Sequence, residues 1–173
     1  MKSFFIILVG LIILFSPSIS FAESSYVLPY PSTMPGTIFY KLRVIEEKII
    51  KYLYFGDYGQ FNYNLKEADK YLVEAKTLFE YKQYLLGAKA LQESDSYFSK
   101  TLPYLENAKS HGKNISDKRE LLHQASLKHI EVLKALIINT PSDFLWSPEK
   151  TASTPLPLGQ LLNRSIEIRK RYL

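Results

Sequence analysis

The sequence predicts an all-α protein, an antiparallel bundle of four to five helices preceded by an extended, proline-rich N-terminal segment. Between residues 38 and 136, apolar residues recur at alternating spacings of four and three, which places them on one face of successive helices. Most of the prolines lie outside that region, where they exclude helix. The chain has 173 residues, 46% of them apolar, and no Cys, so packing of a core rather than disulfides must stabilise it.

Residues 1–22 are expected to form a secretory signal peptide. Twelve apolar residues, 4–15, follow Lys2, and Ser20 and Ala22 supply small side chains at the two positions that a signal peptidase reads. The apolar run is shorter than the roughly 20 residues of a membrane-spanning helix. We therefore expect cleavage after Ala22 rather than an uncleaved anchor, and an exported protein that is secreted, periplasmic or associated with the cell envelope.

Residues 23–36 form the extended segment, and the helical bundle domain is predicted over 37–140. Three prolines between residues 29 and 35 hold the first of these stretches extended. The apolar spacing then predicts a first helix from about Ile38 to Phe55. We expect Gly56 to end this helix, because helices commonly end at a residue in the left-handed conformation.

The clearest helical pattern runs from Phe61 to Phe79. This second helix is predicted to begin between Tyr58 and Asn64, because Asn64 with Glu67 resembles a capping box. The apolar register changes near residue 85, so a turn is expected at 80–84.

Three further elements complete the prediction. A third helix runs from about residue 85 to 108, kinked by Pro103. A fourth helix ends at Asn139, with Ser116 and Asp117 as caps and Glu120 at the capping-box position. A proline-rich loop, 141–157, leads to a basic C-terminal helix, 158–173.

The positive charge of the chain, formally +5, is concentrated in that last helix. Two interpretations stay open: the helix contacts an anionic lipid or wall polymer, or its cations complement the helix dipole, which we favour. The rest of the chain is nearly neutral and export is expected, so we predict no nucleic-acid partner. The basic residues that could contact a surface are Arg164, Arg169, Lys170 and Arg171.

The sequence contains no recognisable catalytic constellation. It has no Cys and no Gly-x-Ser-x-Gly, and its glycines are too scattered for a phosphate-binding loop. We therefore expect no enzymatic activity and no cofactor.

One metal-binding pattern occurs, Glu120-Leu-Leu-His123. Dinuclear sites in helical bundles need two Glu-x-x-His copies and two further carboxylates, and this chain has one copy. We favour a structural interpretation, with Glu120 as a cap and His123 in solvent, and keep both residues as weak metal-ligand candidates. His129 lies on the apolar face of its helix, which is more typical of a core histidine than of a ligand.

An apolar cluster, Phe144-Leu145-Trp146, lies within the proline-rich loop. Such residues either hold the loop against the bundle, which we favour, or dock a partner. All three are therefore candidates for an interaction site.

Part of the chain resembles a known family. Leu28-Pro-Tyr-Pro-Ser-Thr-Met-Pro-Gly36, Tyr40-Lys-Leu-Arg43, Phe55-Gly-Asp57 and the Ala-rich segment 68–79 resemble uncharacterised exported helical domains of bacteria. The resemblance covers residues 28–105 and implies an extracytoplasmic helical module with no established activity and no catalytic or ligand residues.

Together these observations predict a non-catalytic interaction or structural module at the cell envelope, with a protein or envelope polymer as its partner. The alternative is an exported bundle that binds a metal or small ligand at Glu120 and His123.

Overall fold

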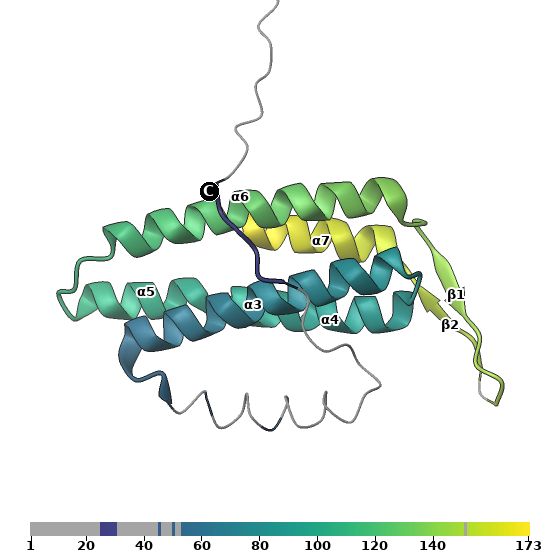
Figure 1. Ribbon diagram of the computed structural model, residues 1–173, viewed down its shortest axis with the longest axis horizontal. Coiled ribbons are helices and arrows are strands. Elements are labelled where there is room, and N and C mark those ends of the chain that lie inside the picture. The colour runs from purple at the N-terminus through teal and green to yellow at the C-terminus, as the bar shows by residue number, and fades with distance from the viewer. Residues whose placement is uncertain (1–24, 31–44, 46–49, 51–52, 151) are drawn as a thin grey trace, which may run out of the picture.

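A computed structural model describes residues 25–30, 45, 50, 53–150 and 152–173. The predicted signal peptide, most of the segment 23–36 and most of the predicted helix 38–55 lie outside these residues. The described elements are helical except for one hairpin (Figure 1), which confirms the all-α class. They are α3 (Gly56–Glu80), α4 (Tyr84–Phe98), α5 (Thr101–Ser110), α6 (Ser116–Asn139), β1 (Phe144–Trp146), β2 (Thr154–Leu156) and α7 (Leu158–Lys170).

The helices lie side by side in two layers (Figure 1). The first layer holds α3 against α4 and α5, and the second holds α6 against α7. Contacts of α3 with α6 and of α4 with α7 join the layers. None of the helices in the described part of the chain combines the length and apolar character required to cross a membrane.

Two hydrophobic clusters fill the space between the layers. The cluster nearer the hairpin includes Leu72, Leu91, Leu133, Leu136, Leu158 and Leu162. The other cluster includes Phe61, Leu65, Phe98, Leu105 and Leu122. Most of these residues belong to the apolar faces expected from the sequence, which explains why the predicted helices and the observed helices largely coincide.

The start of α3 differs from the prediction. The helix begins at Gly56, whose φ of 67° is accessible to glycine without cost, rather than between 58 and 64. Asn64 and Glu67 are buried inside the helix, and the Asn64 side chain donates to the Gln60 carbonyl (2.7 Å) instead of capping. The first turn of α3 packs closely against the residues just before it, since a Cβ at Gly59 would lie 2.8 Å from the carbonyl carbon of Tyr54.

The turn expected at 80–84 is confirmed at residues 81–83. Gln83 N–H donates to the Leu78 carbonyl (2.8 Å) and Lys82 N–H to the Phe79 carbonyl (2.9 Å), the two bonds of a Schellman motif. The residue at the left-handed position is Lys82, with φ 59°, where glycine is usual.

Lys82→Gly is therefore expected to raise the free energy of unfolding by about 0.5–1 kcal/mol. Glycine adopts the left-handed conformation without strain, and this gain exceeds the larger conformational entropy that glycine loses on folding. Urea denaturation measures the change. Lys82→Ala is the control, since it keeps the Cβ and should give no gain. Equal stabilisation by both substitutions would show that the side chain, not the backbone, is responsible.

The predicted third helix is two helices, α4 and α5, separated at Ser99 and Lys100. The expected kink at Pro103 is therefore wrong. A proline ring clashes with the carbonyl four residues earlier, here that of Ser99, so the helix breaks at that point. Pro103 then occupies the first turn of α5, where its missing N–H is not needed.

The span of α6 matches the prediction, but its capping does not. Asn114 Oδ1 accepts from Ser116 N–H (3.0 Å) and from the Ser116 hydroxyl (2.8 Å), so Asn114, rather than Ser116 or Asp117, provides the acceptor for the first N–H group of the helix. Glu120 does not reach back to the helix start, because its Oε1 accepts from Gln124 Nε2 (2.8 Å).

The stretch 141–157, expected to be a loop, contains an antiparallel hairpin. Phe144 pairs with Leu156, and Trp146 pairs with Thr154. At its base, Gly159 N–H donates to the Ser142 carbonyl (2.8 Å) and fixes the hairpin to the start of α7. The strands are three residues long and β2 contains Pro155, so the sequence carries little strand signal.

Candidate functional site

A network of polar side chains lies buried among the helices. Arg169 of α7 and His129 of α6 are fully buried, and Asp69 of α3 and Asp95 of α4 are nearly so. Burying charges costs free energy unless they are paired and hydrogen-bonded. The charged members of this network meet that condition, because each is hydrogen-bonded to another member. Its members are Tyr26, Asp69, Ser94, Asp95, His129, Ser165 and Arg169.

Arg169 is the centre of the network. Its Nη1 forms an ion pair with Asp95 Oδ1 and donates to the Ser165 carbonyl (3.0 Å). Its Nη2 donates to the Ser94 hydroxyl (2.8 Å). Its Nε donates to His129 Nδ1 (3.1 Å). All three guanidinium nitrogens thus have an acceptor within the protein.

The contact with Arg169 fixes the protonation of His129. A guanidinium can only donate, so His129 Nδ1 accepts and carries no proton. The ring proton is then on Nε2, which donates to Asp69 Oδ1 (2.7 Å). Burial lowers the pKa of His129 and the positive charge of Arg169 lowers it further, while the bond to Asp69 acts in the opposite direction. The buried imidazole is therefore neutral.

The network reaches the N-terminal segment through Asp69. Its second oxygen, Oδ2, accepts from the Tyr26 hydroxyl (2.5 Å). Burial and the neighbouring Asp69 charge raise the pKa of Tyr26, so the phenol keeps its proton. Segment 25–30, which runs across the helices in Figure 1, is thereby tied to α3.

Asp95 closes the other end of the network. Its Oδ2 accepts from the Ser165 hydroxyl (2.7 Å), and its Oδ1 pairs with Arg169. A continuous chain of hydrogen bonds therefore connects segment 25–30 with α3, α6, α7 and α4.

This arrangement is suited to holding helices together rather than to reacting with a substrate. Both nitrogens of His129 are bonded to protein groups, and the ring packs against Phe98, with centroids 4.9 Å apart. General base catalysis requires a substrate proton within hydrogen-bond reach of the base. Of the five charged or ionisable side chains of the network, Asp95 alone borders one of the four best-formed cavities of the described residues, and His129 borders none of these four.

Arg169 corrects a sequence-based prediction. It was expected among the surface cations of the last helix, and its side chain is instead fully buried. The spacing of α7 carried a signal that the charge obscured, because Ser165 and Arg169 continue the buried face of Leu158 and Leu162 at spacings of four and three. By contrast, His129 is confirmed as a core histidine.

The other three basic candidates are exposed. Lys170 pairs with Glu167 (2.7 Å), one turn earlier on α7. Arg164 and Arg171 lie on different cavities, described next.

Glu120 and His123 lie on one side of α6 and line a cavity of about 580 Å³, together with Arg119, Arg171 and Tyr172. His123 is half-buried rather than in solvent, and its buried Nδ1 has no hydrogen-bond partner among the described residues. Within the described ranges, no three His, Asp or Glu side chains come together in a group that could hold a metal ion.

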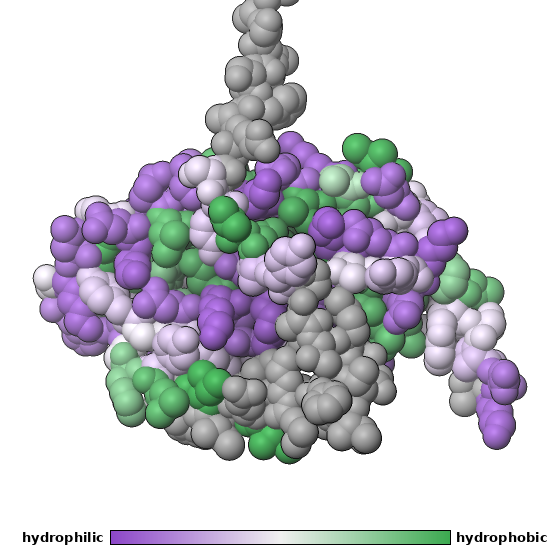
Figure 2. Space-filling model, viewed as in Figure 1, coloured by the Kyte–Doolittle hydropathy of each residue, from purple (hydrophilic) through white to green (hydrophobic). Residues whose placement is uncertain are grey.

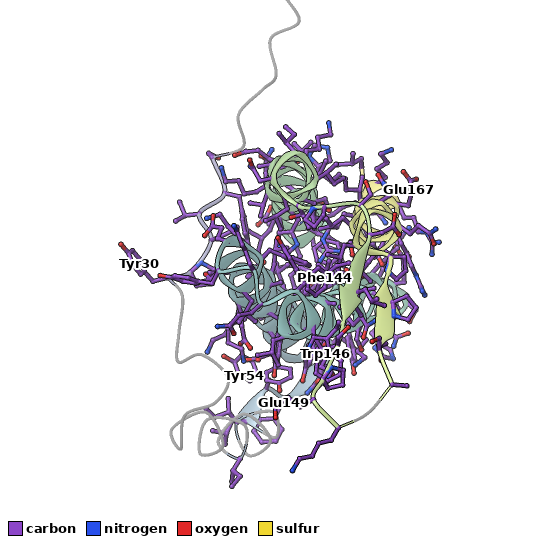
Figure 3. All side chains as sticks on the ribbon, turned by 90° about the vertical axis from the view of Figure 1, so that its right-hand side faces the viewer. Tyr30, Tyr54, Phe144, Trp146, Glu149 and Glu167 are labelled. Atoms are coloured by element: carbon purple, nitrogen blue, oxygen red, sulfur yellow. The ribbon has the colours of Figure 1, made fainter. Side chains whose placement is uncertain are left out.

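The apolar cluster 144–146 is divided between the two sides of β1. Phe144 and Trp146 are half-buried on the side toward the helices (Figure 3), and the Phe144 ring lies 4.8 Å from that of Tyr84. Leu145 points the other way and is 59% exposed. In Figure 2 the hairpin has an apolar base and a hydrophilic tip that extends beyond the helices.

A groove begins beside the hairpin and follows the junction of α4 and α7. Two cavities, of about 230 and 340 Å³, share Gln92, Leu161 and Arg164 and so form one depression. Leu156 of β2 lines one end and Ile168 the other. Among the described residues, Arg164 has no acidic partner within ion-pair distance and is the cation of this groove.

Comparisons with known protein families, with curated protein sequences and with solved structures find no match to this chain. Function must therefore be argued from the chain itself.

Proposed function

We propose that this protein is an exported helical module that acts without catalysis at the cell envelope, by binding a protein or envelope polymer. In this proposal an antiparallel bundle with an extended, proline-rich entrance serves as a rigid support. The binding surface is the hairpin together with the groove between α4 and α7.

The observation that carries the proposal is the groove itself. It follows the basic helix α7 and ends at Leu156 of β2, the strand that pairs with the cluster 144–146. Its floor offers apolar Leu156 and Leu161, and Arg164 is available for an acidic group of the partner. The buried network is assigned a structural role rather than a binding role, because its charged side chains bond to one another.

Position-dependent photo-crosslinking in the native host tests this proposal. A crosslinking amino acid at Leu145 and, separately, at Gln160 of the groove is expected to capture the same molecule. Glu131, exposed on α6 and outside the groove, is the control position. Different products at 145 and 160, or the same product at 131, would contradict the proposed surface.

Substitutions in the hairpin should separate its two faces. Phe144→Ala is expected to lower the free energy of unfolding by about 1–2 kcal/mol, because a half-buried ring is lost from the core edge. Trp146 lies on the same face as Phe144, so Trp146→Ala should also lower the free energy of unfolding. Leu145→Asp, on the opposite face, should leave the bundle folded and weaken capture of the partner. Urea denaturation measures the first effect and the crosslinking yield from position 160 the second, and unfolding of Leu145→Asp would contradict this division.

A second candidate function, small-ligand or metal binding at Glu120 and His123, is favoured by one observation. Both residues line a cavity of about 580 Å³, and the buried Nδ1 of His123 has no hydrogen-bond partner among the described residues. Elemental analysis of protein purified without an affinity tag tests the metal version. Stoichiometric zinc or iron that is lost in His123→Ala and kept in His111→Ala would establish it in place of the first proposal.

A further inference from the structure

We propose that the hydrogen bond between His129 and Arg169 is an acid-released latch that holds α7 against α6. The inference is independent of the proposed function, because it rests on the buried network alone.

The geometry of the latch requires a neutral imidazole. Arg169 Nε–H donates to His129 Nδ1 at 3.1 Å, and His129 Nε2–H donates to Asp69. A protonated imidazole carries N–H on both nitrogens and accepts no hydrogen bond. Protonation would therefore place Nδ1–H of His129 against Nε–H of Arg169, and two positive charges side by side inside the protein. The hydrogen bond between these two residues could not persist.

The groups facing His129 come from every neighbouring element. Asp69 of α3 favours the charged ring, but it already accepts a bond from Tyr26 of segment 25–30. Asp95 of α4 also favours it, but this carboxylate is paired with Arg169. Arg169 of α7 opposes the charged ring directly, and Phe98 of α4 covers the ring with an apolar surface.

Burial is the largest influence, and it lowers the pKa of His129 below its ordinary value of 6.5. The unfolded chain therefore takes up a proton on this histidine before the folded protein does. The contribution of neutral His129 to the free energy of unfolding is fully present above pH 6.5. It is lost as the pH falls from 6.5 to the pKa of His129 in the folded protein. A single proton increases the unfolding equilibrium constant by up to about tenfold per pH unit in that interval.

Release is expected to be local. Arg169 keeps its ion pair with Asp95, and Ser165 keeps its bond to the same carboxylate, so α7 stays attached to α4. Below the folded pKa, the junction between α6 and α7 loosens while that between α4 and α7 remains.

The decisive experiment compares the full chain with two histidine variants. Unfolding constants are measured in urea at pH 7.5 and 5.5 for the unsubstituted protein, for His129→Gln, and for His111→Gln as the control. Glutamine offers an amide donor and an acceptor but does not titrate. His111 is exposed and pairs with Asp57 alone among the described residues.

The increase in unfolding constant between the two pH values should be larger in the unsubstituted protein than in His129→Gln, by up to about tenfold. His111→Gln should follow the unsubstituted protein. Equal pH dependence with and without His129 would overturn the latch.

A measurement that needs no substitution covers the case in which His129→Gln does not fold. Nitrogen NMR of isotopically labelled histidine in the full chain reports which ring nitrogen is protonated. At pH 7.5 we expect one neutral histidine with its proton on Nε2, which gains a second proton below pH 6.5 as the α7 amides lose exchange protection relative to those of α4. A buried ring that is already doubly protonated at pH 7.5, or protonated on Nδ1 alone, would refute the proposal.

Discussion

Arg169→Leu is expected to lower the free energy of unfolding by about 3–5 kcal/mol, a large share of the roughly 5–15 kcal/mol that stabilises an ordinary domain. The substitution leaves the Asp95 carboxylate buried without its cation, and it removes the donor to His129 Nδ1. Urea denaturation at pH 7.5 measures the loss.

Arg171→Leu is the matched control, because Arg171 lies two residues further along and is exposed. Its effect should stay within about 0.5 kcal/mol. Adding Asp95→Leu to Arg169→Leu should restore part of the lost stability, since removing both charges is less costly than stranding one. Similar effects of the two arginine substitutions would mean that the buried network contributes little.

Phe98→Ala is expected to have an effect of similar size, about 3–5 kcal/mol. Phe98 is fully buried, and its ring centroid lies 4.9 Å from that of His129 and 5.0 Å from the guanidinium carbon of Arg169. Truncation creates a cavity and opens the network to water. Calorimetry or urea denaturation measures the change.

Phe98→Leu is the control for this prediction, since it keeps an apolar side chain over the network. We expect a loss of about 1–2 kcal/mol, well below that of the alanine variant. Comparable losses in both would indicate that ring contacts with His129 and Arg169, rather than exclusion of water, dominate.

Much of the helical framework could be predicted from the sequence, because apolar periodicity is a local signal. The end of α3, the extent of α6 and the turn at 81–83 follow from it. The start of α3 depends on how the preceding chain enters the helix, and the break before Pro103 depends on one backbone clash. The hairpin escaped prediction because its strands are short and contain a proline.

The buried network could not be predicted in the same way. Asp69 and His129 are 60 positions apart, and Asp95 and Arg169 are 74 apart, so no local pattern joins them. A run of basic residues ordinarily faces solvent, and this expectation concealed Arg169. The available signal was the helical spacing, which puts Ser165 and Arg169 on the same face of α7 as two buried leucines, Leu158 and Leu162.

The position of Arg169 near the end of the chain has a consequence for the order of synthesis. Asp95 is made long before the cation that pairs with it, so a nascent chain shorter than about 169 residues lacks the counter-charge of this interior carboxylate. Docking of the last helix is thus the step that brings the counter-charge to Asp95. Such a delay agrees with the proposed export through a secretory signal peptide, a route on which a chain crosses the membrane before it folds.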